Sequence, residues 1–133
     1  TRMVLDPKSI DTVVASNLHA DILTDLAASL SGSMGIAPTA NLDPDKRHPS
    51  MFEPIHGSAF DIMGQGIANP IGSYWSAVLM LENLGELQAA QKLMFAIEKL
   101  TEDKKVLPKD LGGKSTTKQI TKAMIDIISG KNN

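Results

Sequence analysis

The chain has 133 residues, of which 42% are hydrophobic and only 4% aromatic, so it has the length of one domain with a largely aliphatic core. A net charge of −2 without any basic run argues against a nucleic-acid partner. No apolar stretch approaches the ~18 residues of a membrane span, which argues against a membrane partner. The chain has no cysteine, which excludes disulfides and fits the reducing cytoplasm, where we expect the protein to act.

The first predicted element is a short strand over residues 12–15, because Thr-Val-Val-Ala is β-branched and apolar. Ser16 or Asn17 then offers an N-cap for a helix over "LHADILTDLAASL". Gly32 and Gly35 are expected to end this helix and to open a turn. Five apolar side chains of the helix share one face: Leu18, Ile22, Leu23, Leu26 and Leu30.

Residues 43–49 are polar and predict only a solvated turn. Three helices are predicted in the chain that follows this turn. Asn69 and Pro70 indicate the N-cap and first residue of a helix that stops at Gly85. Two more helices are predicted over residues 86–100 and 115–129, and Gly130 ends the last one. Their apolar faces are Leu87, Ala90, Met94 and Ile97 in the first, and Ile120, Ala123, Met124, Ile127 and Ile128 in the second. Because few strand candidates accompany these helices, the sequence predicts an α/β protein with an incomplete sheet and packed helices.

Asp21 and Asp25 are four residues apart on the first predicted helix, so their Cβ atoms should lie about 5–6 Å apart on one face. Like charges at this spacing repel one another, and a hard divalent cation such as Mg²⁺ would relieve the repulsion. The alternative is that Asp21 caps the first turn and that Asp25 is simply solvated. The spacing by itself favours this simpler interpretation.

The run "MFEPIHGSAFDIMGQGIANPIG", residues 51–72, is too long for an ordinary connection and too apolar for a disordered linker, so it predicts an ordered binding loop. Its glycines permit positive φ angles and close approach of a ligand to the backbone. Asp61 could bind a ribose diol and repel a 2′-phosphate, His56 could pack on adenosine, and Asn69 could contact the adenine edge. The alternative is a structural Ω-loop that caps the next helix, and the chemistry leaves the two interpretations even.

Three stretches, "VVASNLHADILTDLAASLSGSMGIAPTANL", "FEPIHGSAFDIMGQGIANPIG" and "DLGGKSTT", together resemble the C-terminal third of the β-decarboxylating dehydrogenases, the isocitrate/isopropylmalate dehydrogenase family. The resemblance covers nearly the whole chain and is strongest to the tartrate/D-malate branch. It implies that residues 1–133 are the C-terminal portion of the isopropylmalate dehydrogenase-like α/β fold. Residues 1–40 would supply a strand and a metal-binding helix at a dimer interface, and residues 41–133 an NAD-binding loop and the C-terminal helices.

Carried over by motif, the resemblance implies that Asp21 and Asp25 bind Mg²⁺ or Mn²⁺ together with the substrate. Asp61 followed by Ile62 is the family's pattern for NAD, whereas Ala20 and Phe60 stand where the family usually has glycine and proline. The implied contacts to NAD are Glu53, His56, Gly57, Ser58, Ala59, Asp61, Ile62 and Asn69.

The resemblance also implies an activity, the metal-dependent and NAD-linked oxidation and decarboxylation of a 2-hydroxy dicarboxylic acid such as tartrate or D-malate. The family's proton-transfer residues lie upstream of this region, so no catalytic residue is expected in the segment and the isolated chain should be inactive. The expected partners are the missing N-terminal part of the same protein and a second subunit of a homodimer. The alternatives are a 3-isopropylmalate dehydrogenase of leucine biosynthesis and a non-catalytic nucleotide-binding module.

Overall fold

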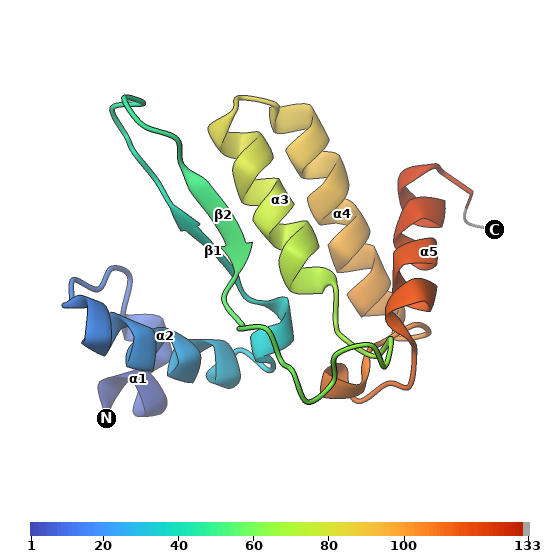
Figure 1. The fold of residues 1–133 in the computed structure, drawn as a ribbon, viewed down its shortest axis with the longest axis horizontal. Coiled ribbons are helices and arrows are strands. Elements are labelled where there is room, and N and C mark those ends of the chain that lie inside the picture. The colour runs from blue at the N-terminus through green and yellow to red at the C-terminus, as the bar shows by residue number, and fades with distance from the viewer. Residues whose placement is uncertain (132–133) are drawn as a thin grey trace.

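The computed structural model describes residues 1–131, which form helices around one two-stranded sheet (Figure 1). The N-terminal part contains α1 (Arg2–Leu5), a 3-10 turn η1 (Pro7–Ser9) and α2 (Asn17–Leu30). A hairpin follows, consisting of the 3-10 turn η2 (Met34–Ile36), β1 (Pro38–Asn41) and β2 (Met51–Pro54). The C-terminal part contains α3 (Ile71–Asn83), α4 (Leu87–Asp103), a 3-10 turn η3 (Lys109–Leu111) and α5 (Thr117–Ile128). The predicted α/β class, with an incomplete sheet and packed helices, is confirmed.

The strand predicted over residues 12–15 is wrong, because these residues are irregular and exposed. Val14 has 97% of its surface exposed, and a β-branched segment forms a strand only where a neighbouring strand can pair with its backbone. The two strands that do form lie instead where a turn and the start of the long loop were predicted. They pair antiparallel from Pro38 opposite Pro54 to Asn41 opposite Met51.

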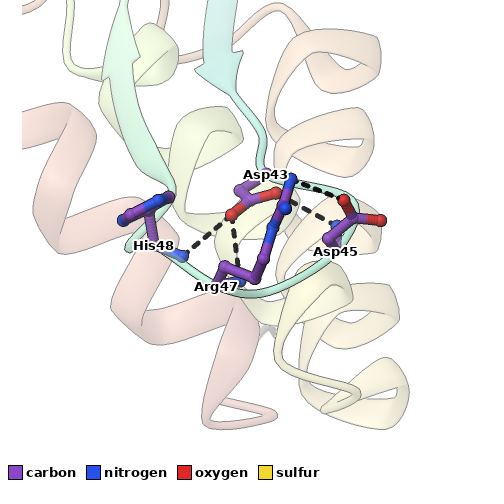
Figure 2. A network of polar contacts seen from close by, with 4 residues as sticks. All are labelled: Asp43, Asp45, Arg47 and His48. Atoms are coloured by element: carbon purple, nitrogen blue, oxygen red, sulfur yellow. Dashed lines mark hydrogen bonds and ion pairs between the residues drawn. The ribbon is translucent and has the colours of Figure 1, made fainter.

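The loop between the two strands is organised by one carboxylate, so the prediction of a merely solvated turn is incomplete. The Asp43 carboxylate accepts hydrogen bonds from the backbone N–H groups of Asp45, Arg47 and His48, at 3.1, 2.9 and 2.8 Å (Figure 2). The side chains of Arg47 and Asp45 add an exposed ion pair of 2.8 Å. Exposed ion pairs contribute little to stability, so the three hydrogen bonds to Asp43 shape this loop.

The hydrophobic core lies among α3, α4 and α5, which stand beside one another in Figure 1. The predicted faces of α4 and α5 are confirmed at Ala90, Ile97, Ile120 and Met124, which are all buried, whereas Leu87 is 57% exposed. The core residues are Ile71, Val78, Ala90, Ala96, Ile97, Leu100, Ile120 and Met124. The three helices therefore form the stable base on which the hairpin and the long loop are placed.

A glycine allows the hairpin to approach the first turn of α3. A Cβ atom at Gly72 would lie 3.0 Å from the carbonyl oxygen of Gly35 and 3.1 Å from Cβ of Pro54. These distances are shorter than ordinary van der Waals contacts, so a side chain at this position would push α3 away from the hairpin. The start of α3 is thereby held against the segment that leads out of α2.

Helix α2 forms where the sequence predicts it, but its apolar face is not buried by the described chain. Leu18, Ile22, Leu26 and Leu30 are 66%, 59%, 38% and 46% exposed. Leu23 faces an apolar cavity of about 390 Å³ between α2 and the N-terminal segment, which Met3 and Ile10 also line. Amphipathic helices gain their stability by packing one face, so α2 has a face that residues 1–131 leave open. Among these residues, no helix is both long and apolar enough to cross a membrane.

Candidate functional site

The predicted metal ligands Asp21 and Asp25 lie on successive turns of α2, and both are exposed. Within residues 1–131, no group of three or more histidine, cysteine, aspartate or glutamate side chains is arranged to hold a metal ion. Two carboxylates on one helical face are suitable oxygen ligands for Mg²⁺ or Mn²⁺, which take further ligands from substrate or water. The two carboxylates are therefore suitable as some of the ligands of a metal site. The assignment of Asp21 and Asp25 as metal ligands stays a prediction.

The long loop lines a cleft with a volume of about 930 Å³. This volume falls within the roughly 300–1,000 Å³ of typical small-molecule sites. Three separate segments form its walls: residues 33–35 after α2, residues 56–69 of the loop, and residues 109–117 before and at the start of α5. Gly35, Gly57, Gly64 and Gly66 are among the lining residues, and their lack of side chains suits the close approach of a nucleotide.

Six of the eight residues predicted to contact NAD line this cleft, and two do not. The six are His56, Gly57, Ser58, Ala59, Ile62 and Asn69. Glu53 is exposed on β2 opposite Thr39, and Asp61 is exposed in the turn beside the cleft. The cleft thus brings together most of the predicted cofactor residues, and their assignment to NAD stays a prediction.

The loop reaches its shape through residues in the left-handed backbone region. Gly64 and Gly66 have φ angles of 77° and 69°, as expected for glycines in a ligand-binding loop, whereas Gly57 and Gly72 do not use this freedom. Ala59 also has a positive φ of 44°, which is unusual for a residue with a side chain. It directly precedes Phe60, and a proline there would favour an extended conformation at Ala59. In this chain the phenylalanine is therefore compatible with a turn that proline would oppose.

Asn69 caps α3 as predicted, because its Oδ1 accepts the backbone N–H of Ile71 at 2.9 Å. The other atom of its amide, Nδ2, donates to the carboxylate of Asp110 at 2.8 Å. Asp110 also accepts a hydrogen bond from the hydroxyl of Ser33. Residue-by-residue reasoning did not single out Ser33 or Asp110, although Asp110 opens the "DLGG" stretch that carries part of the resemblance.

The far side of the loop is held by α5. The backbone N–H of Thr117 donates to the carbonyl of Gly66 at 2.9 Å, and its hydroxyl donates to the carbonyl of Ala68 at 2.5 Å. Thr116 and Gln119 form a capping box that fixes the start of the same helix. Thr117 is a third cleft residue that the sequence reasoning missed, after Ser33 and Asp110, and the "STT" run before the last apolar pattern was the available signal.

Comparison with known proteins identifies the group to which this geometry belongs. The family model described as isocitrate/isopropylmalate dehydrogenase matches residues 1–128. A probable tartrate dehydrogenase/decarboxylase of Agrobacterium vitis is 60% identical over 98% of this chain and 36% of its own length. A D-malate dehydrogenase (decarboxylating) of Escherichia coli is 46% identical over 96% of the chain and 36% of its own length. The chain therefore spans about a third of the curated relatives that it matches.

The solved structures agree with the family model. The isocitrate dehydrogenase of Methylococcus capsulatus superposes with a TM-score of 0.89 at 38% identity, over 96% of this chain and 37% of that protein. A β-decarboxylating dehydrogenase of Thermococcus kodakarensis superposes with a TM-score of 0.81 at 35% identity. The expected isopropylmalate dehydrogenase-like fold is confirmed, and the chain belongs to the isocitrate/isopropylmalate dehydrogenase family.

Proposed function

We propose that the chain is the C-terminal part of a metal-dependent, NAD-linked dehydrogenase that oxidises and decarboxylates a 2-hydroxy dicarboxylic acid such as tartrate or D-malate. The observation that carries this proposal is the similarity over nearly the whole chain to proteins named tartrate dehydrogenase/decarboxylase and D-malate dehydrogenase. The cleft of about 930 Å³ beside α3 and α5 supports it, because its glycine-rich wall suits a dinucleotide. The missing N-terminal part of the protein would complete the active site.

The residues of this chain have binding roles in the proposal. His56, Gly57, Ser58, Ala59, Ile62 and Asn69 would surround the adenosine part of NAD, with Glu53 and Asp61 at the edge of the cleft. Asp21 and Asp25 would hold Mg²⁺ or Mn²⁺, which when bound polarises the hydroxyl and carboxylate of the substrate. Proton transfer is left to groups outside this segment, so we expect no turnover by residues 1–133 on their own.

The open face of α2 supports a homodimer, in which this helix would pack against a second subunit. The lack of cysteine is the support for the cytoplasmic location that we predict.

The choice of cofactor depends on Asp61 in this proposal. An exposed carboxylate at the edge of the cleft would accept hydrogen bonds from the ribose diol of NAD and repel the 2′-phosphate of NADP. In the complete protein we expect kcat/KM with NAD to exceed kcat/KM with NADP. Asp61→Asn should lower the ratio of these two values roughly tenfold, which corresponds to about 1.4 kcal/mol. Asp45→Asn changes an equally charged and exposed residue in the hairpin loop and serves as the control.

The measurement is NADH or NADPH formation with tartrate, D-malate and 3-isopropylmalate as substrates. Turnover of tartrate or D-malate with NAD supports the proposal, and a clear preference for 3-isopropylmalate would assign the protein to leucine biosynthesis. An equal or higher kcat/KM with NADP would contradict the role of Asp61. Nucleotide binding without turnover of any of the three acids would favour the non-catalytic module.

A further inference from the structure

At the wall of the cleft, one carboxylate joins three segments that lie far apart in the sequence. Asp110, in η3, accepts hydrogen bonds from the hydroxyl of Ser33, which follows α2, and from the amide of Asn69, which precedes and caps α3. These partners are 77 and 41 residues away along the chain. Ser33 also accepts the backbone N–H of Gly35 at 2.9 Å, so the network continues into η2. All four residues line the cleft.

The two hydrogen bonds of the Asn69 side chain determine which way its amide faces. Oδ1 must lie toward the N–H of Ile71, which is a donor, and Nδ2 must lie toward the carboxylate of Asp110, which is an acceptor. A flipped amide would place an oxygen against the carboxylate and an NH₂ group against the N–H, so both contacts would be repulsive. Asp110 and the N–H of Ile71 therefore fix together the orientation of an amide that the cofactor proposal places beside adenine, and Asp110 is the side chain that holds its NH₂ end.

The network is packed too closely to tolerate a larger neighbour. A Cβ atom at Gly35 would lie 2.6 Å from Oδ2 of Asp110 and 3.0 Å from Nδ2 of Asn69. Real Cβ atoms essentially never come as close as the first distance, so any side chain at this position must displace the carboxylate. The absence of a side chain at Gly35 is thus a requirement of the contact between Asp110 and Asn69.

We propose that Asp110 is a positioning residue for nucleotide binding, which acts on the cofactor through Asn69 by fixing the amide that lines the adenosine end of the cleft. The inference rests on the proposed function, because it takes the ligand of the cleft to be an adenine dinucleotide. It goes beyond the cofactor assignment in three ways: it adds Asp110, it states that Asp110 acts through Asn69, and it requires glycine at position 35. Asp110 touches no reacting atom in this role.

The experiment uses the complete protein and measures equilibrium binding of NAD and of ADP-ribose, which carries the adenosine part of NAD without the nicotinamide. Asp110→Ala is expected to weaken the binding of both ligands roughly tenfold, which corresponds to about 1.4 kcal/mol. The value of kcat at saturating NAD and the KM for the hydroxy acid should remain within about twofold, because the bound ground state and the transition state lose the same binding energy to the cofactor. Asp110→Asn, which keeps one acceptor oxygen, should lose less than Asp110→Ala.

A double-mutant cycle separates positioning from a general structural effect. If Asp110 acts through Asn69, then Asp110→Ala should add little to the loss already caused by Asn69→Ala. Gly35→Ala should reproduce the effect of Asp110→Ala on both ligands. Asp126→Asn, at a carboxylate that pairs with Lys122 on α5 outside the cleft, is the matched control and should bind like the wild type.

The outcomes distinguish this proposal from the proposed function. A wild-type protein that binds neither NAD nor ADP-ribose contradicts the proposed function and this proposal with it. A wild type that binds NAD, together with an Asp110→Ala variant that binds it equally well, contradicts only the role of Asp110. Fully multiplicative losses in the double variant would also contradict it, because Asp110 would then act independently of Asn69. A thermal unfolding curve for each variant shows that the loss concerns binding and not folding.

Discussion

Helix α2 and helix α5 have similar sequence patterns and opposite surroundings. Both are amphipathic, yet α5 buries Ile120 and Met124 completely against α3 and α4, while α2 leaves Ile22 and Leu26 exposed. In Figure 1 the two helices lie at opposite ends of the molecule, with the hairpin and α3 between them. An apolar stripe thus indicates that a helix packs against something, but the stripe does not say whether the partner lies in the same segment of chain.

The largest expected difference between the two helices is in folding stability. Ile120→Ala should lower the free energy of unfolding of the chain by about 2–5 kcal/mol, because it leaves a cavity in the core. Ile22→Ala, at a side chain 59% exposed, should change it by less than about 0.5 kcal/mol. Urea unfolding followed by circular dichroism measures both. Equal losses in the isolated chain would mean that α2 is packed after all.

The open face of α2 should make the isolated chain self-associate, because burying one large aliphatic side chain contributes about 1.5–3 kcal/mol. Ile22→Lys should therefore weaken self-association at least about tenfold, as measured by sedimentation velocity at several concentrations. Val14→Lys is the control, since Val14 is 97% exposed and lies outside the helix. A stable monomer at every concentration would contradict this expectation.

The carboxylates of α2 are expected to affect metal binding and to leave the folding stability unchanged. In the complete protein, Asp21→Asn and Asp25→Asn should each weaken Mn²⁺ binding about tenfold or more, because each removes a charged oxygen ligand and preserves shape. The melting temperature without metal should stay the same, since both side chains are exposed. Asp11→Asn is the control. Wild-type titration curves for both variants would support the simpler interpretation, in which Asp21 and Asp25 are ordinary surface residues.

Local patterns were sufficient for the four longer helices, α2 to α5, but they missed the short helix α1 and were insufficient for the strands. The cap at Asn69 and the stop at Gly85 depend on neighbouring residues in the sequence and were predicted correctly. The predicted faces of α4 and α5 were correct at their buried positions but not at Leu87, which is exposed. The strand at residues 12–15 was wrong because a strand needs a partner, which local composition cannot supply. The positions of β1 and β2 were missed for the same reason, since their pairing joins segments on either side of the Asp43 loop.

In the candidate site, too, the features that depend on neighbouring residues were predicted, and the features that depend on contacts between distant segments were missed. The glycine-rich wall of the cleft was predicted from its own residues, and six of the eight proposed contacts line it. Asp110, Ser33 and Thr117 were missed because their importance comes from hydrogen bonds to distant segments, not from the residues beside them. The resemblance pointed to the "DLGG" and "STT" stretches without indicating what their side chains contact.

The construction of the cleft also has a consequence for the order of events during folding. Its walls come from segments as far apart as Ser33 and Asp110, separated by 77 positions, and joining them requires the chain to close long loops. Contacts of such high sequence separation form slowly, whereas the turn between α3 and α4 brings neighbouring helices together at once. The three-helix base can therefore assemble before the cleft exists. A nucleotide analogue with a fluorescence signal would then report the last step of folding, after circular dichroism has already reached its final value.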